Sequence, residues 1–281
     1  MEFKEFNGGI IFENIRELEL SQTLDCGQCF RWEEIEDGVF SGIAMGRCAK
    51  VELCGEKLYI YGAKAEDAEL WWDYFDLGLD YAKVRSELAN ISPVLDAAAE
   101  YAQGIRILKQ DAWEALCSFI ISQNNNIPRI KGIIKRLCEC FGDKLENGYD
   151  FPSADVMAQL TVEQLAPLRS GFRAKYLMDA AAKVSSGEID LGKISVMPIE
   201  DARQELMKIK GVGPKVAECV LLYGMHRLEC FPMDVWMKRA MSVLLPDITV
   251  EQLGAYAGIA QQYIFHYSRM NPQLFEGNSE K

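Results

Sequence analysis

The 281-residue sequence lacks any apolar run close to the ~18 residues that a membrane-spanning helix needs. Its N-terminal segment, MEFKEFNGGIIFENIRELEL, is acidic and has no long apolar stretch, so it does not follow the pattern of a signal peptide. We therefore expect a cytoplasmic protein without a membrane partner. The sequence also has no low-complexity segment and no repeat in the period range of repeat proteins.

Metal ligands are scarce as well. The chain has two histidines and one C-x-x-C pair, Cys26 and Cys29, while Cys138 and Cys140 have the wrong spacing, so we expect no zinc site. Nine scattered cysteines, an odd number, indicate free thiols. The C-G-Q-C segment leaves a thiol redox enzyme open as an alternative, although that motif needs a βαβ context and a strand-like F-R-W-E segment follows here.

Acidic residues outnumber basic residues by 42 to 30, which gives a formal net charge of −12 at pH 7. Taken alone, this charge argues against a polyanionic partner. Basic residues nevertheless gather at 129–136, 169–175, 208–215 and 238–239. They can serve a polyanion only if the fold brings them around one site.

Hydrophobic periodicity divides the chain into two parts. Between about residues 38 and 61 apolar residues alternate, and V-E-L and L-Y-I flank C-G-E-K as the strands of a hairpin would. From about residue 64 the pattern is helical; it predicts helices at 112–120, 201–208, 214–223, 234–244 and 251–270, and Thr161 with Gln164 is a capping-box signature for another. We predict an α+β fold, with a small antiparallel β domain over residues 1–104 and a mostly helical domain over residues 105–281.

The segment IKGVGPKVAECV, residues 209–220, interrupts a helical pattern with glycine and proline. Gly211 can end one helix in a left-handed conformation. Gly213 permits a tight turn, and Pro214 suits the first position of the next helix. The predicted helix–hairpin–helix exposes backbone N–H groups at a helix N-terminus, where phosphate binds. An ordinary helix–helix turn remains the simpler alternative at this point.

Lys215 and Asp234 are the candidate reactive groups. Lys215 falls in the first turn of the second helix, where the helix dipole opposes a cation by ~0.3–1 kcal/mol and favours the neutral, nucleophilic amine. Asp234 follows nineteen residues later in F-P-M-D-V-W, at the start of another helical pattern. It can cap that helix, and it can also stabilise positive charge that develops near the lysine.

Taken together, these segments resemble one family. LDCGQCFRW, SQNNNIPRI, FRAKY, GVGPKVAECV, FPMDVWM and GIAQQYIFHYS occur in the order found in the 8-oxoguanine DNA glycosylases of the helix–hairpin–helix superfamily, and the resemblance spans about residues 20–269. It implies a bifunctional DNA glycosylase and AP lyase that excises 8-oxoguanine, preferentially opposite cytosine, in base excision repair. In that reading Lys215 forms a Schiff base with the sugar C1′ and cleaves the strand by β-elimination, with Asp234 assisting.

The resemblance also implies a site for the damaged base. Gly27 presents its backbone carbonyl to N7–H of the lesion, where guanine has an acceptor instead, so one carbonyl attracts the first and repels the second. Gln261 reads the Watson–Crick edge, and Phe265 and Cys219 sandwich the flipped ring. Lys215 and Cys219 are four residues apart, as are Gln261 and Phe265, so each pair shares one helix face.

Further residues are implied to contact the DNA. Asn124, Arg129 and Arg173 would bind the cytosine that the flipped base leaves behind. Two positions depart from the family pattern: Phe172 stands where tyrosine is often found, and Trp236 where many members have histidine. Phe172 keeps an aromatic wedge without the hydroxyl, and the indole of Trp236 keeps one donor but no charge. We expect these departures to change affinity or opposite-base preference rather than to abolish the chemistry.

The hairpin is implied to grip a phosphate through Gly211, Val212 and Gly213, and to accept a monovalent cation, K⁺ or Na⁺, through backbone carbonyls of Met207, Ile209 and Val212. No cysteine follows Cys230, so the four-cysteine iron–sulfur cluster of the endonuclease-III-like branch is not expected. The implied partner is double-stranded DNA containing 8-oxoguanine. We expect a monomer that needs no cofactor and that associates with the nucleoid if its source is bacterial.

Two alternatives from the residues stay open. A non-catalytic helix–hairpin–helix DNA-binding module would need no paired Lys215 and Asp234. A glycosylase for alkylated bases often works without the lysine.

Overall fold

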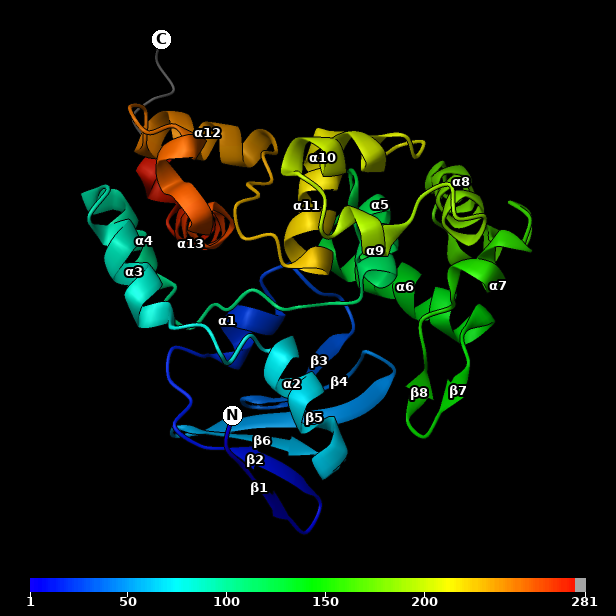
Figure 1. Cartoon of the computed structure of the whole chain (residues 1–281), viewed down its shortest axis with the longest axis horizontal. Helices are drawn as coiled ribbons and strands as arrows, with labels where there is room; N and C mark the ends of the chain where they lie inside the picture. Colours follow the sequence, from blue (N-terminus) through cyan, green and yellow to red (C-terminus); the bar gives the residue numbers. More distant parts are fainter. Residues whose placement is uncertain (276–281) are drawn as a thin grey trace.

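The computed structural model describes residues 1–275 as an antiparallel sheet that lies below a mostly helical body (Figure 1). Six strands form the sheet in the order β1-β2-β6-β5-β4-β3. Their bounds are Phe3–Phe6 (β1), Gly9–Phe12 (β2), Trp32–Glu36 (β3), Val39–Ala44 (β4), Arg47–Cys54 (β5) and Lys57–Tyr61 (β6). The predicted α+β class is confirmed.

The hairpin expected around C-G-E-K is present as β5 and β6. Leu53 pairs with Leu58 and Cys54 with Lys57, and Gly55 takes a φ of 59° in the two-residue turn. Strands β1 and β2 were not predicted, whereas the strand-like F-R-W-E segment contains the start of β3. Strands β1 and β2 have four residues each, too few to give an alternating pattern, and all of W-E-E-I-E in β3 except its tryptophan is exposed.

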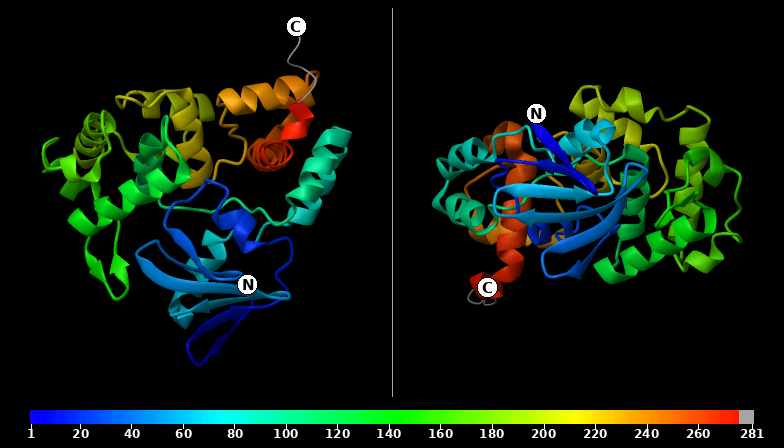
Figure 2. Two further views of the ribbon diagram at one scale, coloured as in Figure 1. Left: turned by 180° about the vertical axis from the view of Figure 1, so that it is seen from behind. Right: turned by 90° about the horizontal axis from the view of Figure 1, so that it is seen from below.

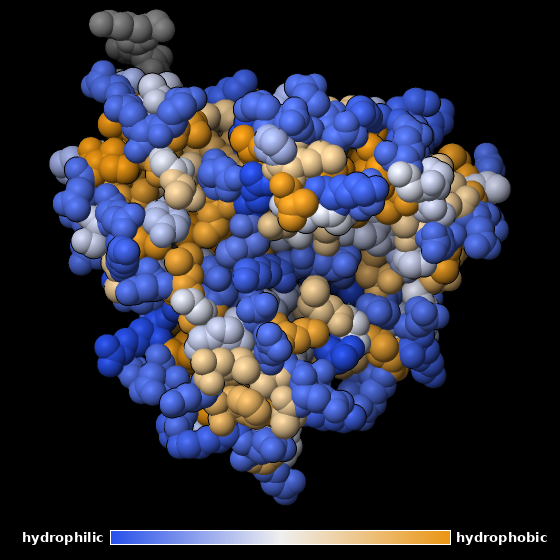
Figure 3. All heavy atoms as spheres, in the orientation of Figure 1, coloured by the Kyte–Doolittle hydropathy of each residue, from blue (hydrophilic) through white to orange (hydrophobic). Residues whose placement is uncertain are grey.

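The sheet has a hydrophobic core of its own, shared with helix α2 (Ala68–Tyr74). Val51, Leu58 and Ile60 of the sheet are fully buried together with Trp71 of that helix. Figure 2, in its view from below, shows the strands crossing in front of the helical body. On the face seen in Figure 3, hydrophilic residues predominate and apolar residues appear in separate patches.

The remaining helices build the larger part of the molecule. They are α1 (Leu20–Leu24), α3 (Tyr81–Ala89), α4 (Pro93–Tyr101), α5 (Ala112–Ser122), α6 (Ile127–Phe141), α7 (Ala154–Ala158), α8 (Arg173–Ser185), α9 (Leu191–Ile194), α10 (Ile199–Met207), α11 (Pro214–Met225), α12 (Val235–Leu244) and α13 (Ala257–Met270). Short 3₁₀ helices cover Ala65–Asp67 (η1), Ala166–Leu168 (η2), Val250–Tyr256 (η3) and Pro272–Phe275 (η4), and a small hairpin joins Lys144–Leu145 (β7) to Gly148–Tyr149 (β8). Helix α5 forms the centre of this part, because every residue from Ala115 to Ile121 is buried.

Two helix predictions were wrong in detail. Thr161 and Gln164 do form the reciprocal capping-box bonds, at 2.8 and 3.3 Å, but turns and η2 follow instead of an α-helix. Pro167 explains the difference, because it lacks the N–H that a continuing helix needs. The predicted helix over 251–270 is divided into η3 and α13, and Gly254, with φ 64° and ψ −143°, kinks the chain within η3.

Helices α3 and α4 come before residue 105 in the sequence but lie beside α13 (Figure 1). Their residues Val84, Leu88 and Leu95 belong to the hydrophobic core of the helical body. The domain boundary at residue 104 stays a prediction. Among the helices of residues 1–275, none combines the length and the apolar character that a bilayer crossing requires.

Candidate active site

A cavity of about 720 Å³ opens where the loop after α1 meets α5, α11, the start of α12 and α13. Six predicted site residues from four separate segments line it: Gly27, Lys215, Cys219, Asp234, Gln261 and Phe265. The structure thus brings together the whole set that was expected to carry the chemistry and bind the base. The role of each residue stays a prediction.

Lys215 reaches this cavity from the first turn of α11. The hairpin before it has the expected geometry, with Gly211 at φ 81°, Gly213 as the N-cap and Pro214 as the first helical residue. Lys215 is half-buried, and its Nζ lies 5.5 Å from the centre of the Phe119 ring. Within residues 1–275 the Lys215 ammonium forms no ion pair with a carboxylate. Its amine therefore faces the cavity without a neutralising partner.

Asp234 serves as the N-cap of α12, as the simpler interpretation predicted. Its Oδ1 accepts a hydrogen bond of 2.7 Å from the backbone N–H of Met237. This bond fixes the carboxylate at the rim of the cavity. Oδ2 forms no hydrogen bond to another part of the described chain and can face a charge that develops in the cavity.

Gly27 lies in the loop between α1 and β3 with a φ of 91°, a conformation that favours glycine. An added Cβ would lie 3.6 Å from Ile127 Cδ1, an ordinary van der Waals distance, so the backbone conformation rather than space calls for glycine. Within residues 1–275 the Gly27 carbonyl accepts no hydrogen bond, which leaves it available to a ligand.

The next residue, Gln28, holds this loop in place. It is fully buried, and its Nε2 donates to the carbonyls of Thr23 and Arg106 while its Oε1 accepts from the N–H of Leu108. On the other side of the loop, Lys131 Nζ donates to Asp25 and to the Trp32 carbonyl. The position of the Gly27 carbonyl is thus fixed from both sides.

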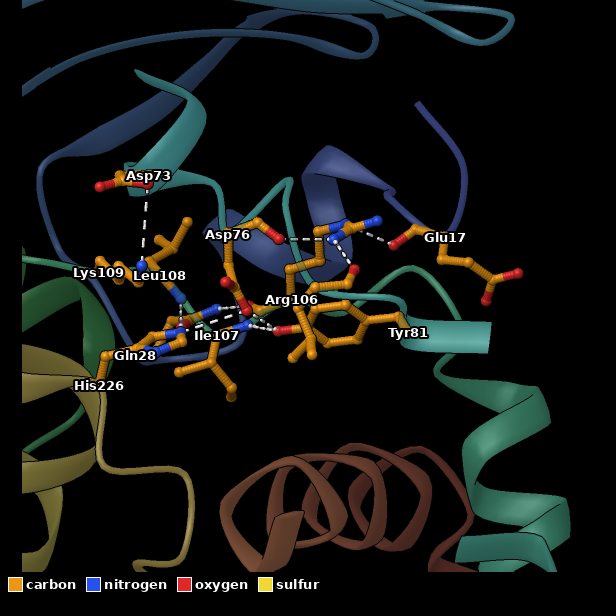
Figure 4. A network of polar contacts seen from close by, with 11 residues as sticks. Glu17, Gln28, Asp73, Asp76, Tyr81, Arg106, Ile107, Leu108, Lys109 and His226 are labelled. Carbon is orange, nitrogen blue, oxygen red and sulfur yellow. Dashed lines mark hydrogen bonds and ion pairs between the residues drawn. The ribbon is translucent and has the colours of Figure 1, made fainter. Parts of the chain in front are cut away.

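The segment that Gln28 grips is itself anchored by Arg106 (Figure 4). The buried Arg106 guanidinium donates to the Asp76 carbonyl over 2.8 Å and lies 4.5 Å from the centre of the Tyr81 ring. The Tyr81 hydroxyl donates to Asp76 Oδ2 and accepts from the N–H of Ile107. Sequence reasoning missed Gln28 and Arg106, and the only local signal was a charged residue between apolar ones in I-R-I.

The expected walls for the base lie on α11 and α13. Cys219 is buried, and burial raises the pKa of its thiol while the neighbouring Lys215 opposes that rise. Phe265 is half-buried, with the Arg269 guanidinium 5.4 Å from its ring centre. Gln261 is 5 % exposed, and its Oε1 accepts hydrogen bonds from the buried side chains of Tyr223 and Gln262.

The residues expected to contact the opposite cytosine lie outside this cavity. Asn124 and Arg129 are exposed near the start of α6. Arg173 is buried and turned inward, where its guanidinium donates to the backbone carbonyls of Gln123, Asn124 and Ser170. In this structure Arg173 therefore holds the loop that carries Asn124, and the nearby Arg129 charge adds to the burial that lowers its pKa.

The two departures from the family pattern have different surroundings. Phe172 is 52 % exposed, so its ring is available to insert between bases of the DNA as the predicted wedge. The indole N–H of Trp236 donates to the hydroxyl of Ser268 over 3.0 Å, and its ring lies against Phe275 with centroids 5.4 Å apart. The one donor that Trp236 kept is therefore used within the protein rather than offered to a phosphate.

All nine cysteines are free. Cys26 and Cys29 belong to different hydrophobic clusters, and burial raises the pKa of Cys26 to about 11 and that of Cys29 well above its ordinary value. A redox pair needs an accessible thiol with a lowered pKa. The buried thiols of Cys26 and Cys29 therefore do not support the alternative of a thiol redox enzyme.

Residues 1–275 contain no group of three His, Cys, Asp or Glu side chains placed to hold a metal ion. A cation at the hairpin would use backbone oxygens instead. The Ile209 carbonyl already accepts a bond of 3.0 Å from the Val212 N–H. The cation site of Met207, Ile209 and Val212 stays a prediction.

Comparison with known proteins supports the resemblance found in the sequence. The family model for the N-terminal domain of 8-oxoguanine DNA glycosylase matches residues 10–116, and the model for HhH-GPD superfamily base excision DNA repair proteins matches residues 117–250. An N-glycosylase/DNA lyase of Saccharomyces cerevisiae is 30% identical over 269 residues, which cover 80% of this chain and 68% of the yeast protein.

Two solved structures are similar over nearly the whole chain. A structure of MBOgg1 in complex with a low affinity DNA ligand is 42% identical, with a TM-score of 0.92 over 96% of this chain and 99% of the other. The Clostridium acetobutylicum 8-oxoguanine glycosylase/lyase, in complex with DNA containing cytosine opposite 8-oxoG, is 39% identical, with a TM-score of 0.90 over 97% and 99%. The chain belongs to the 8-oxoguanine DNA glycosylase family within the HhH-GPD superfamily.

Proposed function

We propose that this protein is a bifunctional DNA glycosylase and AP lyase that excises 8-oxoguanine, preferentially opposite cytosine. One observation carries the proposal: Lys215 and Asp234 share a cavity with the Gly27 carbonyl and with the walls formed by Cys219 and Phe265. The reaction needs a nucleophile, a carboxylate, an acceptor for N7–H of the base, and side chains that stack on both faces of the base.

The chemistry follows from this arrangement. The neutral Lys215 amine attacks C1′ of the flipped nucleotide, and the bond from C1′ to the base nitrogen breaks, so the base leaves with the bonding electrons and takes up a proton. Asp234 stabilises the positive charge that develops on the sugar. The sugar ring then opens to a Schiff base, a proton leaves C2′, and the C3′–O bond breaks by β-elimination.

Selectivity for the lesion would come from Gly27. Its free carbonyl can accept N7–H of 8-oxoguanine but meets a lone pair at N7 of guanine. Gln28 and Lys131 keep the loop from moving to relieve that repulsion.

Opposite-base preference would use Asn124, Arg129 and Arg173. Asn124, just before α6, and Arg129, in its first turn, are exposed, so their amide and guanidinium donors can reach an unpaired cytosine. Arg173 would have to exchange its backbone carbonyl partners for the base. The complex of the Clostridium acetobutylicum relative with cytosine opposite 8-oxoG supports this preference.

The remaining expectations are part of the same proposal. The chemistry would need no metal or redox cofactor, a monovalent cation would sit at the hairpin, and the protein would act as a cytoplasmic, DNA-associated monomer. With a net charge of −12, its non-specific DNA binding should be modest and depend strongly on salt.

Borohydride trapping tests the proposal directly. Wild-type protein is incubated with a labelled duplex that carries 8-oxoguanine opposite cytosine, and the Schiff base is reduced to a stable covalent adduct. We expect an adduct with wild type and none with Lys215→Gln. Lys193→Gln is the matched control, because Lys193 is an exposed lysine of α9 paired with Asp190.

An adduct with wild type and with Lys193→Gln, and none with Lys215→Gln, would establish the nucleophile and the substrate together. Tight binding of the lesion duplex without any adduct or base release would overturn the proposal and favour a non-catalytic DNA-binding module. Base release without an adduct would mean a glycosylase that does not use the lysine.

A further inference from the structure

The hairpin before Lys215 is held by two residues that have no part in the steps above. Asp179 and Lys183 lie one turn apart on α8 and form an ion pair, with 3.3 Å between Asp179 Oδ2 and Lys183 Nζ. Their side chains are only 17 % and 21 % exposed. Each of them forms a second bond, and both of these bonds end on the backbone of the hairpin at 208–213.

The two bonds to the hairpin are complementary. Asp179 Oδ2 accepts the backbone N–H of Lys210 over 2.8 Å, and Lys183 Nζ donates to the backbone carbonyl of Lys208 over 2.5 Å. Lys208 is the C-cap of α10, and the end of a helix leaves carbonyls without an intrahelical partner and attracts a cation. The ion pair thus satisfies one donor and one acceptor of the turn and fixes the turn to α8.

A third contact holds the same turn. Gly211 has a φ of 81°, and a Cβ added there would lie 2.2 Å from Cδ2 of Tyr176, so the tyrosine ring packs directly on the glycine backbone. Tyr176 comes three residues before Asp179 and seven before Lys183, so the three side chains share one face of α8. The hairpin is therefore packed against a single face of this helix.

The hairpin still has donors to offer to a ligand. In contrast to the Lys210 N–H, those of Gly211 and Gly213 donate to no acceptor within residues 1–275. They are the donors that the predicted phosphate contact of the hairpin would use. Because the turn is held from the side of α8, these N–H groups keep one orientation before DNA binds, and less conformational entropy is lost on binding.

Helix α8 also carries the residues expected at the opposite strand. Phe172 immediately precedes the helix, and Arg173 is its first residue. The Phe172 ring lies edge-on to the Tyr176 ring, with centroids 5.7 Å apart. The helix therefore connects the hairpin with the predicted wedge, and the ion pair fixes the distance between these two expected DNA contacts.

We propose that Asp179 and Lys183 are positioning residues that hold the hairpin against α8, so that its free N–H groups and the Phe172 wedge can contact one duplex at the same time. This inference rests on the DNA binding in the proposed function. A carboxylate near a phosphate contact repels DNA, so its removal should tighten binding if charge alone counted. If Asp179 positions the hairpin, its removal should weaken binding instead.

Binding to a duplex that carries a stable abasic-site analogue opposite cytosine tests this role. The analogue is not cleaved and offers no base to the cavity, so the dissociation constant reports contacts with the DNA backbone and the opposite strand. We expect Asp179→Ala to raise Kd about tenfold, the effect of one lost hydrogen bond to a charged group. Asp179→Asn keeps an oxygen for the Lys210 N–H and should recover most of the affinity.

Asp190→Ala is the matched control. Asp190 likewise accepts a backbone N–H, that of Lys193, and pairs with the ammonium of the same residue, at 3.0 Å in each case. Both bonds lie at the start of α9, so this variant removes the same charge and the same kinds of bond away from the hairpin. It should not weaken binding.

Lys183→Met tests the other partner and serves if Asp179→Ala does not fold. It keeps most of the aliphatic stem and should also raise Kd about tenfold, because the Lys208 carbonyl loses its charged donor. Since the Lys183 ammonium bonds to a carbonyl rather than to a phosphate, the slope of log Kd against log salt concentration should stay as in wild type.

The outcomes are distinct. Unchanged or tighter binding by Asp179→Ala would overturn the positioning role and leave the proposed function intact. Equal weakening by Asp190→Ala would also overturn it, because the effect would then be a general loss of stability. A salt slope lowered by about one in Lys183→Met would overturn it too, since the ammonium would then contact a phosphate itself. Failure of wild type to bind the duplex would overturn the proposed function and this inference together.

Discussion

The conformation of Gly27 predicts that replacing it with alanine lowers base-release activity much more than it lowers the free energy of unfolding. In Gly27→Ala the new methyl group meets Ile127 at 3.6 Å, so it fits without a clash. The cost comes from the φ of 91°, since a left-handed conformation costs an L-residue ~1–2 kcal/mol. For a chain of this size, each 1 kcal/mol shifts the unfolding temperature by roughly 2–4 °C.

The chain can relieve this strain only by rotating the loop, which displaces the Gly27 carbonyl. A displacement of about 1 Å at a reacting group can cost 100-fold in rate. We therefore expect 8-oxoguanine release to fall by about that factor, while unfolding in urea shows a loss of no more than ~2 kcal/mol. Cleavage of a preformed abasic site should continue, because it does not need the carbonyl.

Gly38→Ala is the matched control. Gly38 has a φ of 69° in the exposed turn between β3 and β4, and no atom of residues 1–275 beyond its chain neighbours lies within 4 Å of an added Cβ. It should lose a similar amount of stability and keep full activity. If Gly27→Ala loses stability and activity in the same proportion as Gly38→Ala, or keeps full discrimination between 8-oxoguanine and guanine, the argument from the carbonyl is refuted.

Two further predictions concern buried groups. Arg31 donates to the largely buried Glu114 over 3.0 Å, so Arg31→Met should cost about 3–5 kcal/mol in urea unfolding at pH 8. Burial raises the pKa of Glu114 to about 7, so the folded state keeps its proton at pH 5 and the loss should be smaller there; an equal loss at both pH values would contradict this. Iodoacetamide at pH 8 should modify the exposed Cys54 in native protein and leave Cys26, with its pKa of about 11, unmodified until denaturant is added; mass spectrometry that finds early modification of Cys26 would contradict its burial.

The part of the candidate site that depends on local spacing could be predicted from the sequence. Lys215 and Cys219 are one helical turn apart, and so are Gln261 and Phe265. Once α11 and α13 form, each pair must share a face, and the cavity contains all four. The hairpin could be predicted for the same reason, because glycine and proline constrain only their immediate neighbours.

The direction of a side chain depends on partners far away in the chain, and local sequence patterns do not predict it. Arg173 turns toward the carbonyl of Gln123, fifty residues earlier in the chain. Trp236 gives its N–H to Ser268, thirty-two residues later. No local pattern contains these pairings. The same holds for Gln28, whose role became visible only when the segment around Leu108 lay beside it.

The burial of Cys219 has a consequence for the conditions under which such a protein must work. The lesion that it is proposed to remove is formed by oxidants, and thiolates are the protein groups that those oxidants attack first. Cys219 lines the cavity that is proposed to bind the base, yet burial raises the pKa of its thiol and keeps it protonated. The Cys219 thiol should therefore resist the oxidants that damage the DNA. The protein should then stay active under the oxidising conditions in which more lesions form.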